Sequence, residues 1–479
     1  RIENLAVLAD LLPPGALRER ILALAPRGEV FDLDVEVADA GAGKLPDIRG
    51  RLRFADVGLA PYGKAAGFAG FDGSLDGRGG GGIVQVATRD ASIDWPQQWR
   101  ATAPVVRADA RLEWQRFGDG VRLWLDDAVA DSGHGIARGK LRLLLRPDDA
   151  PLMDVSATAE DFDVTQLWRY LQVNRLSPKA VRWLDAAFRA GRVTKAEVSI
   201  TGPTKGFPYR EGQGVFRVSG HATGIDLFYA AGWPELKGVE SDFQFDGPAL
   251  HATASRGSVG GVPFTDGEVQ SGDLREAIFA ARGRAETDAG RVIRMLQATP
   301  LAPSLGALFA DLSGSGPVKA VAALVLPIKQ FDRRVVTVQA MLEGVNLRLR
   351  GQPVEANDVE GGLWVRNREI QAPALAGRAL GGPWKASITT TPLAGGNLRT
   401  ILRAQGSLQG AALQPIARLP RNAGLTGTAD WRGTLDVLRN VDPKVPARGT
   451  VQLTSDLRGL ASTLPEPFDK PAGASRELD

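Results

Sequence analysis

Apolar and polar residues alternate with a period of two at many places along this chain of 479 residues. Val345, Leu347 and Leu349, for example, alternate with polar neighbours. Successive side chains of a β-strand point to opposite faces, so strict alternation predicts strands with one apolar and one polar face. The chain also contains 57 glycines and 30 prolines, which interrupt such stretches every few residues. These patterns predict a mainly antiparallel β fold. Asp-Gly pairs that begin at Asp72, Asp119, Asp246 and Asp266 are typical of tight hairpin turns.

Helical patterns are few and short. Ser177 followed by Pro178 is typical of a helix start, and an apolar stripe continues from there to Phe188. Similar patterns occupy residues 17–24, 304–312 and, more weakly, 411–419. Each is followed by a turn and a strand, with the turn glycine at Gly28, Gly191, Gly316 and Gly424. This loose repeat predicts helix-plus-strand units over residues 1–163, 164–288, 289–405 and 406–479, the last one truncated.

Composition excludes several classes of protein. Lysine and arginine number 58 against 55 aspartates and glutamates, a net charge of +3, and no dense basic run points to nucleic acid. Hydrophobic residues make up 43%, which excludes a mostly disordered chain. No apolar run approaches the ~18 residues of a membrane-spanning helix. The chain begins with Arg1, and we expect it to be an internal piece of a longer protein.

No motif in the chain predicts catalysis, a metal site or a cofactor. Cysteine is absent, and the three histidines, His134, His221 and His251, lie far apart in the sequence. Gly41 to Lys44 resembles a phosphate-binding loop only superficially, because Leu45 stands where that motif needs serine or threonine. Three groups of acidic residues lack the spacing of an ion-binding loop, and we interpret them as solvated turns between strands. They are Asp126 with Asp127, Asp148 with Asp149, and Asp161 with Asp163.

Fingerprint residues between 176 and 247, and again near the end of the chain, resemble the YhdP family of the AsmA-like superfamily. They are Leu176 to Lys179, Trp183, Leu184, Phe188, Ala190 to Val193, Gly202, Pro203, Phe207, Pro208, Gly214 to Phe216, Gly232 to Pro234, Gly459, Leu460, and Leu464 to Gly473. The resemblance implies bridge-like lipid transport by repeating β-groove units. It also implies a periplasmic part of a protein whose inner-membrane anchor lies outside this chain.

The alternating apolar face is the one feature with a functional mechanism. If the sheet is elongated, twisted and curled along its length, this face lines a hydrophobic groove that suits phospholipid acyl chains. Taken together with the function that the family resemblance implies, this groove leads us to predict non-enzymatic phospholipid transport between inner and outer membranes, with no cofactor and with protein partners unknown. The residues predicted to line the groove are Val239, Phe243, Phe245, Val345, Leu347, Leu349, Leu363, Val365, Val451 and Leu453.

An alternative is a periplasmic structural or assembly scaffold without lipid conduction, in which the helices of the protein itself fill the apolar face. The ten tryptophans are compatible with both alternatives. Packing between helices and sheet is favoured over acyl-chain contact for any one of them.

Overall fold

The computed structural model describes residues 15–38, 47–63, 65–171, 176–300, 302, 307–352, 354–413, 424–442, 445, 447–465 and 469–476. The chain divides into two compact units. Unit 1 comprises residues 1–229, 238–252 and 272–275, and unit 2 comprises 230–237, 253–271 and 276–479. Each unit is described by itself below.

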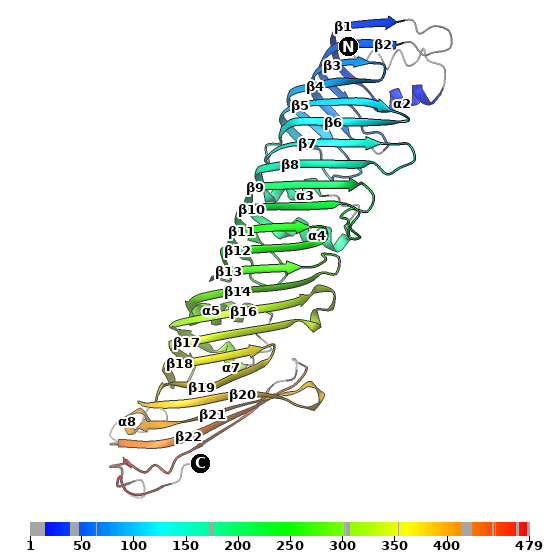
Figure 1. Cartoon of the computed structure of the whole chain (residues 1–479). Coiled ribbons are helices and arrows are strands. Elements are labelled where there is room, and N and C mark those ends of the chain that lie inside the picture. The colour runs from blue at the N-terminus through cyan, green and yellow to red at the C-terminus, as the bar shows by residue number, and fades with distance from the viewer. Residues whose placement is uncertain are drawn as a thin grey trace. The chain divides into compact units, whose positions relative to one another are not determined.

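Unit 1 is a sheet in which neighbours in sequence pair with one another in antiparallel fashion, from β1 to β10 in order (Figure 1). Its strands are β1 (Arg27–Ala38), β2 (Asp47–Leu59), β3 (Gly67–Arg78), β4 (Gly81–Asp94), β5 (Ala103–Phe117), β6 (Gly120–Asp131), β7 (Ile136–Leu145), β8 (Leu152–Asp163), β9 (Phe188–Pro203) and β10 (Val215–Leu227). This topology needs only short hairpin connections for most pairs.

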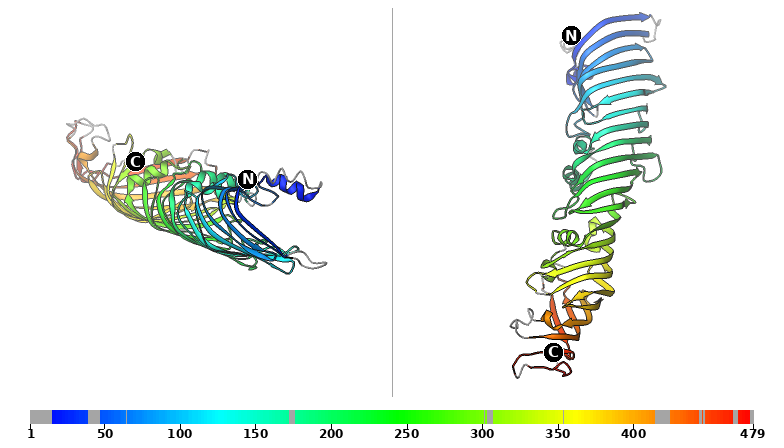
Figure 2. Two further views of the ribbon diagram at one scale, coloured as in Figure 1. Left: turned by 90° about the horizontal axis from the view of Figure 1, so that it is seen from above. Right: turned by 90° about the vertical axis from the view of Figure 1, so that its left-hand side faces the viewer.

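The strands of unit 1 are bent, so that the sheet has a concave and a convex side (Figure 2). β-bulges account for part of this bend, because an extra residue in one strand of a pair kinks that strand. Aspartates with a left-handed backbone lie at many of the bulges in both units. Those next to a register shift are Asp32, Asp56, Asp127, Asp266 and Asp358.

The helices of unit 1 are α2 (Ala16–Leu24), the 3-10 turn η1 (Val164–Gln166), α3 (Leu167–Tyr170) and α4 (Pro178–Ala187). Two predicted helices are confirmed, namely the one that follows Ser177, which is α4, and the one over residues 17–24, which is α2. The Ser177 side chain accepts a hydrogen bond from the Ala180 N–H at 3.2 Å, which satisfies one free donor of the first turn. Figure 1 shows α3 and α4 behind the strands, on the concave side of the sheet.

Two strands contain residues of both units, namely β11 (Leu236–Asp246) and β12 (Ala249–Val259). Unit 2 then continues with antiparallel pairing from β13 through β14, β16, β17 and onward to β23. The strands are β13 (Val262–Ser271), β14 (Ile278–Asp288), β15 (Leu312–Ser315), β16 (Pro317–Pro327), β17 (Val335–Leu349), β18 (Glu355–Arg366), β19 (Glu369–Ala379), β20 (Gly382–Pro392), β21 (Leu398–Gln409), β22 (Thr426–Arg439), β23 (Arg448–Thr454) and β24 (Leu460–Ala461).

The helical elements of unit 2 are α5 (Ala289–Gln297), α7 (Ala307–Ala310), η3 (Ile328–Arg333), η4 (Ala394–Gly396) and α8 (Gly410–Leu413). Helix α5 packs on the sheet through Ala289, which forms a buried cluster with Val318, Val345 and Val359. No described helix combines the length and the apolar character that crossing a membrane requires.

The prediction of a mainly antiparallel β fold with a few short helices is confirmed. Of the helix predicted at 304–312, residues 307–312 are described: Ala307–Ala310 form α7, whereas Leu312 begins β15, so the predicted helix end was wrong. Of the pattern at 411–419, only residues 411–413 are described, and they belong to α8. Helix α5 was not predicted. The division into four repeat units stays a prediction.

Several turn predictions were wrong. Asp119 and Asp246 do lie at hairpin turns, but Asp72 and Asp266 lie inside β3 and β13. Asp126, Asp127, Asp161 and Asp163 likewise belong to strands, whereas Asp148 and Asp149 lie between β7 and β8. The reason is visible at Asp72, whose carboxylate accepts a hydrogen bond from the Asp56 N–H at 2.8 Å. It thereby satisfies a backbone donor at a break in the strand pairing.

Candidate functional site

A continuous row of apolar side chains crosses nine strands of unit 1. Residues directly opposite one another in a sheet point to the same face, so the strand register identifies the row. Its members, from β2 to β10, are Leu52, Leu75, Val84, Leu112, Leu125, Leu141, Val155, Ile200 and Phe216. We call this the unit 1 row. Every position is leucine, valine, isoleucine or phenylalanine, although the register shifts elsewhere in the same strands.

The unit 1 row is only partly covered. All nine side chains are half-buried, with none in the fully buried class. Apolar faces of a sheet are normally covered by a second layer that excludes water. Among the described residues, the largest fully buried side chains are instead just Val345, Val359 and Thr88. The row in unit 1 therefore offers an apolar surface with room for something other than protein.

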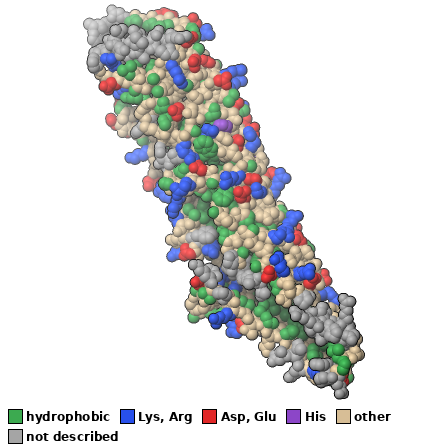
Figure 3. Space-filling model, turned by 180° about the vertical axis from the view of Figure 1, so that it is seen from behind, with side chains coloured by type: hydrophobic (Ala, Val, Ile, Leu, Met, Phe, Trp, Pro, Cys, Tyr) green, Lys and Arg blue, Asp and Glu red, His purple; other side chains and the backbone are tan. Residues whose placement is uncertain are grey.

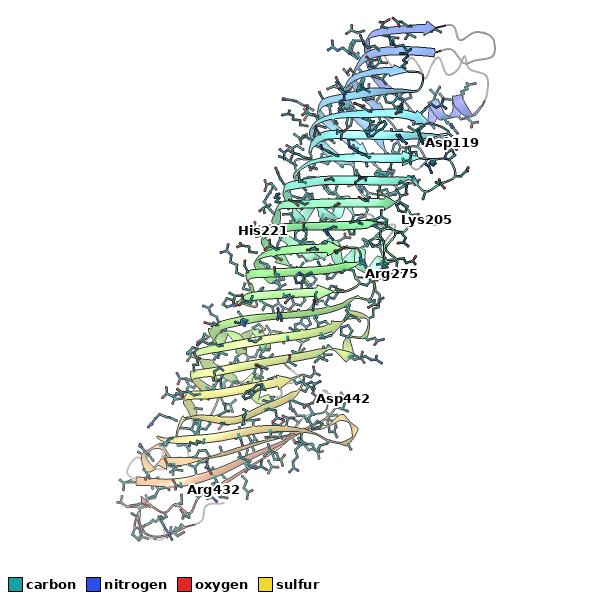
Figure 4. The ribbon with its side chains drawn as sticks, in the orientation of Figure 1. Asp119, Lys205, His221, Arg275, Arg432 and Asp442 are labelled. Carbon is teal, nitrogen blue, oxygen red and sulfur yellow. The ribbon has the colours of Figure 1, made fainter. Side chains whose placement is uncertain are left out.

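The opposite face of unit 1 carries charged side chains in exposed ion pairs. Arg51 pairs with Asp76 at 3.0 Å, and Arg138 pairs with Glu160 at 2.7 Å. Each of these four side chains is 46–70% exposed, so the pairs contribute little to the free energy of unfolding. His221, labelled in Figure 4, belongs to this face, and its Nδ1 lies 2.8 Å from Asp242 Oδ1. The two faces of the sheet thus differ sharply in polarity.

Unit 2 has a row of the same kind across eight strands, which we call the unit 2 row. It comprises Val318, Leu342, Gly361, Leu375, Ala386, Ala404, Gly433 and Leu453, from β16 to β23. Leu342 packs against the cluster under α5, which identifies this as the face that carries the helix. We call the face that contains each row the inward face of its unit.

The unit 2 row differs from the unit 1 row in side-chain size, since four of its eight members are glycine or alanine. An open hollow of about 1010 Å³ centres on this stretch. Six members of the row line it, namely Leu342, Gly361, Leu375, Ala386, Ala404 and Gly433. The charged residues Glu343, Glu360, Lys385, Arg403 and Arg432, which alternate with the row in their strands, also contribute to the lining. Figure 3 views the side that carries the helices and shows hydrophobic side chains (green) in hollows of each unit, with charged side chains mostly toward the margins.

Comparison with known proteins identifies the family. The family described as YhdP protein matches residues 1–479. The chain belongs to the YhdP family. Among curated proteins, the "Intermembrane phospholipid transporter YhdP" of Escherichia coli (strain K12) is 23% identical over 478 residues. The match covers 98% of this chain and 37% of that relative. No solved structure matches the chain.

The residues predicted to line a groove lie in different environments in this YhdP-family chain. Val345 is fully buried and Val239 is 8% exposed, whereas Val451 is 74% exposed. Leu363 and Val365 lie on the inward face, opposite Ala340 and Val338.

The remaining predicted residues have other neighbours. Leu347 packs against the cluster under α5, and Leu349 lies opposite Leu312. Phe243 and Phe245 form an edge contact with ring centroids 6.1 Å apart. Leu453 ends the unit 2 row. The role of these ten residues as groove lining stays a prediction.

Sequence reasoning missed the whole unit 1 row. A weak signal was present, because Val121, Leu123 and Leu125 stand at alternate positions, as do Leu141, Leu143 and Leu145, although Trp124 and Leu144 also lie within these stretches. The register adds what alternation alone does not provide, namely that these positions lie side by side across consecutive strands.

Two tryptophans illustrate how indole rings cover glycines of the inward face. A Cβ atom at Gly82 would lie 2.3 Å from the Trp114 ring, and one at Gly377 would lie 3.0 Å from the Trp384 ring. Trp384 also packs against the cluster beneath α5. The expectation that tryptophans mainly pack against the protein itself therefore fits these two positions. Both nevertheless lie on the face that carries the rows.

Titratable groups do not assemble into a reaction centre in the part of the chain that the structure describes, which holds no cluster of three or more potential metal ligands. The His134 Nδ1 atom lies 2.9 Å from the Tyr170 hydroxyl. A large pKa shift belongs to an ion pair of unit 1 instead. The Arg210 guanidinium, which donates to Asp273 at 2.8 Å, is the main cause that lowers the pKa of Asp273 to about 2.

Proposed function

We propose that this chain conducts phospholipid by holding acyl chains against the inward apolar faces of its two units, without chemical conversion and without a cofactor. The observation that carries the proposal is the unit 1 row, with nine neighbouring apolar side chains that are all half-buried. The name of the relative in Escherichia coli, an intermembrane phospholipid transporter, supports phospholipid as the substrate.

The physical basis is the transfer of hydrocarbon from water to an apolar surface. Burial of one methylene group stabilises the bound state by about 0.8 kcal/mol. Strands repeat every ~4.8 Å, so an acyl chain that moves by one strand exchanges one leucine or valine for another. Because successive positions are chemically alike, no single position holds the chain much more strongly than the next. Such a surface binds lipid and still permits movement along it.

The chain spans 37% of the length of its relative, so transport between two membranes concerns a longer protein. We propose that this chain is a periplasmic part of an inner-membrane-anchored protein, and that parts outside it contact the membranes. The charged face opposite the unit 1 row supports contact of that face with water.

One observation favours the alternative of a structural scaffold. Helix α5 covers part of the inward face of unit 2, where Val345 and Val359 are 0% and 1% exposed. If helices filled the inward face throughout, no lipid would bind. The half-buried unit 1 row favours conduction over this alternative.

Native mass spectrometry of the purified chain tests the proposal. We expect co-purified phospholipid in the wild type and much less in Val84→Asp, which places a charge in the unit 1 row. Gln85→Asp is the matched control, because Gln85 lies one residue further in β4 and points to the opposite face. Equal lipid occupancy in all three proteins, or none in the wild type, would refute conduction and favour the scaffold.

A further inference from the structure

Two arginines without a carboxylate partner lie close together in unit 2. Arg439 ends β22 and is only 8% exposed. Arg368, half-buried, lies in the turn between β18 and β19. Several arginines elsewhere in the unit have acidic partners, as Arg399 has in Asp436 at 2.9 Å and Arg348 has in Glu355 at 3.2 Å. Neither Arg439 nor Arg368 forms an ion pair within the described residues.

Neutral oxygens take the place of carboxylates around both guanidinium groups. Arg439 Nη2 donates to the Arg368 carbonyl oxygen at 2.7 Å and to Thr400 Oγ1 at 2.9 Å. Arg368 Nη2 donates to the Asn440 carbonyl oxygen at 2.7 Å. The Nε atoms of both arginines are buried and have no hydrogen-bond partner among the described residues. Neutral oxygens satisfy part of the donor set, but they leave two positive charges uncompensated.

The electrostatics at this position are therefore unfavourable in the protein alone. Burial is the main cause that lowers the pKa of Arg439, and the charge of Arg368 lowers it further. A buried charge normally has a partner of opposite sign. An anion that contacts both guanidinium groups would supply that partner.

The position of Arg439 indicates which kind of anion fits. On β22, Ala429, Trp431, Gly433, Leu435 and Val437 occupy alternate positions before Arg439, so the apolar stripe of the inward face ends in a cation. Gly433, which lines the hollow, is six residues away, a distance of about 20 Å along the strand. Figure 4 labels Asp442, three residues after Arg439, near the end of β22.

We propose that Arg439 and Arg368 bind a phosphate oxyanion, supplied by the headgroup of a phospholipid whose acyl chains lie along the apolar stripe of β22. Guanidinium groups suit phosphate because their parallel N–H groups match two of its oxygens. The hydroxyl of Thr390, 2.9 Å from that of Thr400, adds a further polar group beside the site. The proposal rests on the proposed function, since it assigns the headgroup end of the same bound lipid.

The test measures binding of three soluble probes to the whole chain by isothermal titration calorimetry. The probes are dihexanoyl phosphatidic acid, dihexanoylglycerol and inorganic phosphate. We expect the wild type to bind the phosphatidic acid at least about tenfold more tightly than the uncharged lipid, as a charge-assisted contact predicts. Arg439→Gln and Arg368→Gln should each remove most of that preference.

Two further variants keep the result interpretable. Arg366→Gln removes one charge two residues before Arg368, from an exposed side chain, and should leave the preference unchanged. Arg439→Lys retains the charge but not the parallel N–H groups, so a partial loss of preference is expected even if Arg439→Gln fails to fold.

Each outcome has a defined meaning. Equal affinity of the wild type for the charged and uncharged lipids would overturn the headgroup site and leave acyl-chain binding intact. Arginine-dependent binding of inorganic phosphate without binding of either lipid would support an anion site supplied by free phosphate. It would contradict both the headgroup assignment and the proposed function. A preference that survives both glutamine variants would overturn the assignment to these arginines.

Discussion

The carboxylate of Asp288 joins helix α5 to the turn before β16, because it accepts hydrogen bonds from the Gly290 N–H at 2.9 Å and from the Gly316 N–H at 2.8 Å. Gly290 lies in the first turn of α5, where backbone donors lack partners within the helix. The same side chain therefore caps the helix and fixes the turn that leads into the next strand.

Replacement of Asp288 by alanine should destabilise unit 2. We expect a loss of about 1–3 kcal/mol in the free energy of unfolding, because both backbone donors lose their acceptor. Urea unfolding followed by circular dichroism measures the change. Glu286→Ala, on the exposed face of β14, is the control and should change the free energy by less than about 0.5 kcal/mol. A similar effect of both substitutions would contradict the capping role.

The ion pair between Arg210 and Asp273 should make the stability of unit 1 depend on pH. The pKa of Asp273 is lowered to about 2, first by its hydrogen bond with Arg210, whereas an unfolded chain has an aspartate pKa of about 3.9. The folded state therefore gains stability above about pH 4, and this gain is lost as the pH falls toward 2.

Arg210→Gln tests this dependence. The variant should be less stable than the wild type at pH 7, and the two proteins should converge as the pH falls below about 2, where Asp273 becomes protonated in the folded state as well. Urea midpoints measured across this range check the prediction. Arg217→Gln breaks a pair with Asp246 that is 55% exposed on both sides, and it should show a smaller effect. A difference between wild type and Arg210→Gln that stays constant with pH would argue against this origin.

The alternation pattern predicted the strands well because side-chain period and strand geometry are directly linked. The bulges could not be predicted in the same way. Asp127, for instance, adopts a left-handed backbone inside β6, and an aspartate in that conformation is equally compatible with a turn. Helix α5 was missed because its signal is short and Gly290 lies in its first turn, where glycine weakens a helical pattern.

The candidate site was harder to predict than the fold, since alternation identifies an apolar face but not what covers it. Val345 and Leu363 lie on the same inward face, yet Val345 is fully buried in the cluster that includes Ala289 of α5, while Leu363 stays half-buried. That difference depends on the packing of a helix some 50 residues earlier in the chain, which no local pattern contains. The arginine pair had no sequence signal either, because 71 residues separate Arg368 from Arg439.

Val345 and Val451, both predicted from the same pattern, should respond in opposite ways to truncation. Val345→Ala removes buried methyl groups beneath α5 and should cost about 2 kcal/mol in the free energy of unfolding. Val451, 74% exposed, should change stability by less than about 0.5 kcal/mol when replaced by alanine. Thermal and urea unfolding of the two variants measures this difference. Comparable destabilisation by both would show that α5 does not cover the sheet at Val345 as described.

The small side chains of the unit 2 row should set the space available to lipid. Ala404 lies between Ala386 and Gly433 in the row, and all three line the hollow of about 1010 Å³. Ala404→Leu adds three carbon atoms where the surface is open, so the fold should tolerate it. The added bulk should occupy part of the volume that acyl chains need. We expect reduced phospholipid occupancy in native mass spectra, with an unfolding midpoint close to that of the wild type.

Thr391→Leu is the matched control, because Thr391 lies on β20 outside the hollow and is exposed. Unchanged occupancy in Ala404→Leu would mean that lipid binds elsewhere on the sheet, whereas a large loss of stability would mean that the hollow is already closely packed.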